Sequence, residues 1–174
     1  MNPAADPIVT FNLQNELLEI LPQMRAFAQF LVRDPERVDD LVQEATVRVL
    51  TSAAQFQPGT NFKAWVFTII RNLYLNDLRK ARRFVDVGDN DDEFATLSSS
   101  PATQESAMEF RNFFRAFWQL GAEHREVLML VGASGFSYER ASEICGCEIG
   151  TVKSRVSRAR KELKKMCEQD ATAS

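Results

Sequence analysis

Apolar residues recur every three or four positions along the first half of the chain, which is the spacing of helices that bury one face. The pattern predicts helices over residues 11–32, 35–52 and 62–83. Because proline lacks an amide donor, Pro22 is expected to break or kink the first helix. Asp34 can cap the second helix and so marks its start.

The helical pattern stops at an acidic, serine-rich stretch, residues 86–101, which offers little to bury. Such a composition predicts a flexible linker. The expected architecture is all-α, with two small helical domains at residues 11–85 and 102–168 on either side of that linker.

The second half predicts helices over residues 102–120 and 122–133. A short helix then begins at Ser137, which can cap it, and ends at Gly146. A turn of about four residues leads into a last helix. The residues of that helix expected to face a core are Ile149, Val152, Val156, Ala159 and Leu163. Two helices joined in this way predict a helix-turn-helix, whose second helix enters the major groove of DNA.

The other face of the last helix carries cations and short hydroxyls without a carboxylate. Its members are Thr151, Lys153, Ser154, Arg155, Ser157 and Arg158. Arginine and lysine neutralise phosphates and bond guanine edges in the major groove. A solvated basic helix has the same composition, but its place in a helix-turn-helix favours DNA binding.

The net charge of the chain does not reveal the basic face of the last helix, because acidic and basic residues are segregated along the sequence. The 174 residues carry a net charge of −3 and a pI of about 5.3, without the basic balance typical of nucleic-acid-binding proteins. Residues 86–109 hold seven acids and no base, whereas residues 151–165 hold seven bases and one acid. The distribution, and not the total, therefore indicates DNA binding.

The second helix of the first half carries a further candidate binding face. Asp39, Asp40, Gln43 and Glu44 form an acidic, amide-rich face of the second helix, which is either solvated or a docking surface for a basic partner.

The third helix combines aromatic residues with bases and amides. Its expected core stripe is Phe62, Trp65, Val66, Ile69 and Leu73. Lys63, Arg71 and Asn72 occupy its other faces, a combination that suits single-stranded nucleic acid. Trp65 can equally be an ordinary core residue. The basic residues at the end of this helix, Arg79, Lys80, Arg82 and Arg83, can simply complement the helix dipole.

Other classes of function find little support. Cys145, Cys147 and Cys167 lack the spacing of a disulfide framework, which is typical of a reducing cytosol. With His124 as the single histidine, no metal site, cofactor or small-molecule substrate is expected, and the chain is not expected to be an enzyme. It has no apolar run long enough for a membrane span, so a cytoplasmic protein is expected.

Four segments in order resemble an extracytoplasmic-function sigma factor of the sigma-70 family. Residues 39–45 resemble the polymerase-docking motif, and residues 64–72 resemble the promoter-melting helix. Residues 124–128 resemble the start of the C-terminal domain, and residues 150–160 its recognition helix. The sequence of residues 135–160 is most similar to those of general-stress sigma factors of alphaproteobacteria.

This resemblance implies three partners: core RNA polymerase, promoter DNA and an anti-sigma factor. It implies polymerase docking through Asp39, Asp40, Gln43 and Glu44, and minus-thirty-five recognition through the basic face of the last helix. Recognition of the unpaired minus-ten bases would involve Phe56, Asn61, Lys63, Trp65, Arg71 and Asn72. The acidic linker is expected to run through a polymerase channel that otherwise holds nucleic acid.

Two alternatives remain at this point. A sigma-like decoy would sequester an anti-sigma factor, but known decoys carry a phosphoreceiver domain that the sequence does not show. A helix-turn-helix repressor would need a dimer interface or an effector pocket, and neither is evident.

Overall fold

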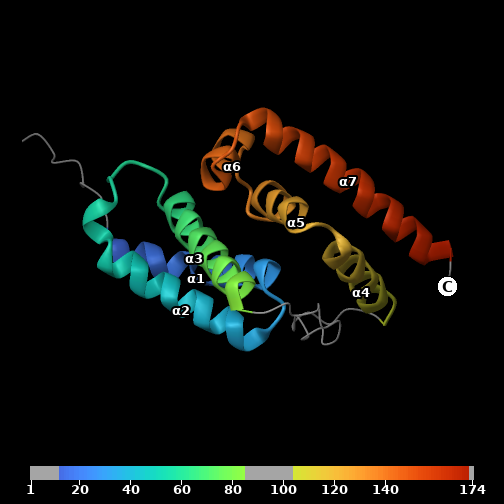
Figure 1. The fold of residues 1–174 in the computed structure, drawn as a ribbon, viewed down its shortest axis with the longest axis horizontal. Helices are drawn as coiled ribbons and strands as arrows, with labels where there is room; N and C mark the ends of the chain where they lie inside the picture. Colours follow the sequence, from blue (N-terminus) through green and yellow to red (C-terminus); the bar gives the residue numbers. More distant parts are fainter. Residues whose placement is uncertain (1–11, 85–103, 173–174) are drawn as a thin grey trace, which may run out of the picture.

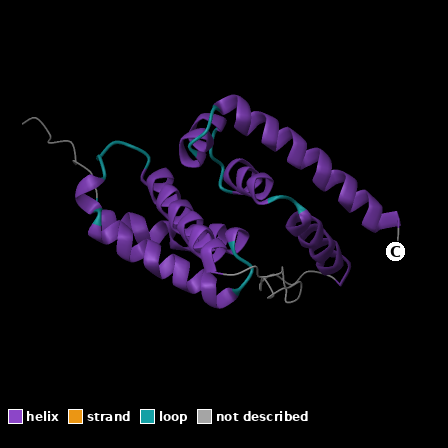
Figure 2. Cartoon of the chain, viewed as in Figure 1, coloured by secondary structure: helices purple, strands orange, loops and turns teal. Residues whose placement is uncertain are grey.

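A computed structural model describes residues 12–84 and 104–172 of the chain. The described residues form helices joined by turns and loops (Figures 1 and 2). The predicted linker, residues 86–101, lies outside them.

The first half consists of α1 (Leu13–Leu31), α2 (Pro35–Thr51), the short 3-10 turn η1 (Ala53–Gln55) and α3 (Phe62–Phe84). The second half consists of α4 (Gln104–Gln119), α5 (Ala122–Leu128), the π-helical turn η2 (Met129–Ala133), α6 (Tyr138–Cys145) and α7 (Ile149–Thr172). In the first half α1, α2 and α3 pack on one another, and in the second half α7 packs along α4, α5 and α6 (Figure 1).

The predicted helix signals in α2, α6 and α7 are confirmed. The Asp34 carboxylate accepts a hydrogen bond from the Glu36 amide at 3.0 Å, and the Ser137 hydroxyl accepts one from the Arg140 amide at 3.2 Å. Gly146 ends α6 in the left-handed region with φ 62°, which a residue without a Cβ adopts at little cost. Val152 and Val156 of α7 are buried.

The expected break at Pro22 is wrong, because α1 runs through this residue as one helix. Pro22 and the exposed Leu18 both face solvent, so the carbonyl that loses its amide partner lies where water can reach it. A helix tolerates the missing hydrogen bond more easily on this side than against the core.

The expected core stripe of α3 is wrong in part. Val66, Phe67 and Ile70 are fully buried, whereas Trp65 and Ile69 are only partly buried. The buried face is wider than one stripe because α3 packs against α1 and α2 on one side and against α6 on the other.

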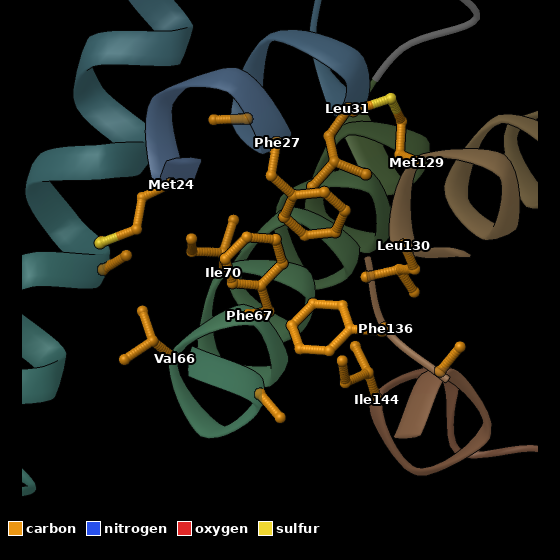
Figure 3. Packing of buried hydrophobic residues seen from close by; sticks show 14 of the residues in the cluster. Met24, Phe27, Leu31, Val66, Phe67, Ile70, Met129, Leu130, Phe136 and Ile144 are labelled. Carbon is orange, nitrogen blue, oxygen red and sulfur yellow. The ribbon is translucent and has the colours of Figure 1, made fainter. Parts of the chain in front are cut away.

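One apolar core extends across both halves of the chain. Phe27 of α1 stacks on Phe67 of α3 at a centroid distance of 4.7 Å, and Phe67 meets Phe136 of the second half edge-on at 5.2 Å. Met129 and Leu130 join the same cluster from η2 (Figure 3). The two halves therefore pack against each other.

Phe136→Ala tests how much this packing contributes. Because Phe136 is 7% exposed at the centre of the contact, the substitution should lower the free energy of unfolding by about 3 to 5 kcal/mol, measured by urea denaturation. Phe113→Ala removes an equally large ring that is 40% exposed, and should cost about 1 kcal/mol. Equal losses in the two variants would contradict the shared core.

Candidate functional site

The basic face of α7 points away from the core. Lys153, Ser157 and Arg158 are exposed, and Thr151 and Ser154 are partly exposed. Arg155 differs from them, because its guanidinium Nη2 lies 2.6 Å from the Glu123 carboxylate of α5. The predicted residues therefore all lie on α7, and one of them, Arg155, forms an ion pair within the protein.

The candidate minus-ten residues of α3 lie at the contact between the two halves. Arg71 Nε donates to the Glu126 carboxylate of α5 at 2.5 Å, and the two side chains are only 16% and 10% exposed. An ion pair so little exposed must be well hydrogen-bonded to offset its desolvation. Arg71 is therefore occupied by the second half of the chain in this structure.

Lys63 is held in the same way. Its ammonium donates to the Ser134 carbonyl at 2.7 Å and lies 4.9 Å from the centroid of the Phe136 ring. Burial lowers the pKa of the Lys63 ammonium from its ordinary value, because the charged form loses hydration.

The remaining candidate minus-ten residues are arranged around the loop before α3. Phe56 is buried against Phe62 and Trp65, with ring centroids 5.2 and 5.3 Å away. Asn61 is exposed and its side-chain oxygen accepts the Ala64 amide at 2.9 Å, which caps α3. Asn72 is exposed further along the helix.

A small cavity of about 190 Å³ lies between this loop and the helix-turn-helix. Asn61, Trp65 and Thr68 line it from α3 and the loop, and Arg140 and Glu143 line it from α6. The minus-ten candidates and α6 thus face each other across a narrow polar space.

The acidic face of α2 is open to solvent. Asp40, Gln43 and Glu44 are exposed, whereas Asp39 forms an ion pair with Arg25 of α1. Val47 and Leu50 continue this face along the helix and are 54% and 45% exposed. These two apolar positions lie outside the buried stripe of α2 and were not among the residues predicted to bind a partner.

Glu126 was also missed, although it carries a signal. It stands four residues before Leu130, on the apolar side of α5, where a carboxylate needs a partner. Sequence alone does not say that this partner is Arg71.

Within residues 12–84 and 104–172, no cluster of histidine, cysteine and carboxylate side chains could hold a metal ion. None of the described helices combines the length and apolar composition that a bilayer-spanning segment requires.

Two family models match the chain, one in each half. The model for sigma-70 region 2 matches residues 18–84, and that for sigma-70 region 4 matches residues 113–163. The sequence is 50% identical over 156 residues to the ECF RNA polymerase sigma factor EcfG of Rhodopseudomonas palustris, which covers 89% of this chain and 84% of the relative.

Solved structures share the arrangement of helices. The sigma factor RpoE of Bartonella quintana, determined in complex with the anti-sigma factor NepR, is 42% identical with a TM-score of 0.75, covering 89% of this chain and 96% of that one. CnrH, determined with the cytosolic domain of CnrY, has a TM-score of 0.65 over 91% of this chain and 88% of that one. Its identity of 23% indicates a common fold only.

Asn61 allows a test of its structural role apart from DNA. Asn61→Ala should lower the free energy of unfolding by about 1 kcal/mol, because the Ala64 amide loses its cap. Asn61→Ser keeps a capping oxygen and should retain most of that stability in the same denaturant titration. If the two variants lost equal stability, capping by Asn61 would contribute nothing.

Proposed function

This chain belongs to the sigma-70 family as an extracytoplasmic-function sigma factor, and we propose how its surfaces divide the work of promoter-specific initiation. A sigma factor binds core RNA polymerase and directs it to promoters. The observation that carries this function is the match of region 2 and region 4 in family order, together with a relative at 50% identity. Neither the decoy nor the repressor is favoured, and the family regulates transcription without catalysing a reaction of its own.

Region 4 recognises the minus-thirty-five duplex through α7. The exposed positions Lys153, Ser157 and Arg158 support this assignment, with Thr151 and Ser154 beside them. A recognition helix reads bases from its first turns, and these residues lie on them.

Region 2 recognises the minus-ten element through α3 and the loop before it. Trp65 presents a partly exposed ring, and Lys63 and Arg71 supply cations that follow an unpaired strand. Phe56, buried behind Trp65, supports the loop that carries Asn61.

Core polymerase binds the outer face of α2. Asp40, Gln43 and Glu44 suit a basic surface, and Val47 and Leu50 add apolar area beside them. Charged residues at such an interface favour fast association, and apolar ones stabilise the complex.

An anti-sigma factor restrains this sigma factor in the cytoplasm, as part of a stress response. The support is the likeness to a sigma factor determined with its anti-sigma factor NepR, at 42% identity over most of both chains.

The two regions separate when the chain engages both promoter elements. The minus-ten and minus-thirty-five elements are about 25 base pairs apart, roughly 80 Å along the duplex. Regions that share one core cannot reach both elements. Opening also frees Lys63 and Arg71, which contact region 4 in the closed chain.

Run-off transcription with core polymerase tests the function and the docking face together. The wild-type chain should direct initiation, and Asp40→Ala should weaken its affinity for core polymerase roughly fivefold. Glu19→Ala removes an exposed acid of α1 and should leave that affinity unchanged. Failure of the wild-type chain to initiate would overturn the function, whereas normal affinity in Asp40→Ala would overturn only the docking face.

Two variants of the ion pair between the regions should act in opposite directions. Glu126→Gln and Arg71→Gln each weaken the closed form, but only Arg71→Gln removes a cation from the minus-ten surface. At limiting sigma factor, initiation should therefore rise in Glu126→Gln and fall in Arg71→Gln. A fall in both, with both variants folded by circular dichroism, would contradict the dual use of Arg71.

A further inference from the structure

Two adjacent residues of α5 hold two residues of α7. The Glu123 carboxylate accepts from Arg155 Nη2 at 2.6 Å, and His124 Nδ1 lies 3.0 Å from Glu162 Oε2. Arg155 and Glu162 are seven residues apart, so they lie two turns apart on the same side of α7. The contacts therefore join α5 to α7 at two points along one line.

Arg155 is enclosed more than the other cations of the recognition face. Its side chain is 22% exposed, although that of its partner Glu123 is 69% exposed. Its second amino group, Nη1, lies 3.9 Å from the Cys147 sulfur in the turn before α7. Arg155 thus contacts both α5 and that turn, whereas Lys153 and Arg158 extend into solvent.

The apolar contacts of α7 involve no directional bonds. Val152, Val156 and Ala159 are fully buried, and Leu163 and Met166 pack against the same core while partly buried. The polar contacts of Arg155 and Glu162 with α5 add directional bonds to this packing. A rotation of about 20° at a side-chain radius of roughly 6 Å moves a side-chain tip by about 2 Å. Hydrogen bonds to bases do not survive such a shift, whereas phosphate attraction tolerates it.

We propose that Arg155 is a positioning residue which, with Glu123 and the contact between His124 and Glu162, fixes the rotation of α7 and so the base pairs that α7 selects. The proposal rests on the proposed function, in which α7 reads the minus-thirty-five duplex. It assigns base selection to Lys153, Ser154 and Arg158, and it places Glu123, outside the recognition helix, among the residues that determine specificity.

The rival role for Arg155 is direct contact with DNA. In that case its guanidinium leaves Glu123 when DNA binds, and Glu123 merely repels phosphates. If Arg155 positions α7, removing the Glu123 charge should lower discrimination between base pairs. If Arg155 contacts DNA directly, the same change should not lower it. The comparison leaves Arg155 itself unaltered.

The experiment measures initiation by holoenzyme from promoters with single base-pair changes in the minus-thirty-five element. The wild-type chain should discriminate about tenfold against a wrong base pair. In Glu123→Gln this ratio should fall to about two- or threefold, because α7 loses its fixed rotation. Glu148→Gln, which removes an exposed carboxylate from the turn before α7, is the matched control and should keep the wild-type ratio.

A second experiment exchanges the charges of Glu123 and Arg155. Arg155→Glu alone should lose discrimination, and the double variant Glu123→Arg with Arg155→Glu should regain at least half of it by restoring the pair. A residue that contacts phosphates directly would leave the double variant as impaired as Arg155→Glu. Thermal unfolding should show all variants folded, since an ion pair whose carboxylate is 69% exposed contributes little to stability.

Unchanged discrimination in Glu123→Gln, or no recovery in the double variant, would overturn the positioning role. Either result would leave the proposed function intact as long as the wild-type holoenzyme initiates and depends on the minus-thirty-five sequence. Loss of that dependence in the wild-type chain would instead overturn the assignment of α7.

Discussion

The pairing of Arg71 with Glu126 is the interaction on which the closed arrangement depends. Each partner comes from a different region, and neither side chain is well exposed. Removing two charges from water is costly, and the close hydrogen bond between Arg71 and Glu126 offsets that cost. In the proposed function, closure and minus-ten recognition compete for Arg71, because one guanidinium cannot bind Glu126 and a DNA strand together.

The closed chain covers its proposed surfaces unequally. The outer face of α2 and the basic face of α7 are exposed, whereas Lys63 and Arg71 of α3 contact region 4. In the proposed function, polymerase and duplex DNA therefore engage the closed chain first, at surfaces in different regions. Moving an equilibrium from 99% closed to 99% open requires about 5.5 kcal/mol of differential binding. In the proposed function, binding of the two regions at promoter elements far apart supplies that difference, because only the open form reaches both elements.

Local signals in the sequence predicted the elements well, and contacts between distant residues set the limit. The caps at Asp34 and Ser137 and the stop at Gly146 involve neighbours a few residues away, so the sequence alone identifies them. The wide buried face of α3 results from packing against helices of both regions, and α1 passes through Pro22 on its solvent side. Among the site residues, exposure on α7 and α2 followed from periodicity. The engagement of Lys63, Arg71 and Arg155 did not, because each binds a residue more than 30 positions away.

Energy transfer between dyes on the two regions tests the opening most directly. Cysteines at Glu19→Cys and Glu168→Cys can carry the dyes once Cys147 and Cys167 are replaced by serine. Burial raises the pKa of the Cys145 thiol to about 12, so this residue stays unlabelled. Transfer should be higher in the free chain than in holoenzyme bound to a promoter. Equally high transfer in the initiating complex would contradict the separation of the two regions.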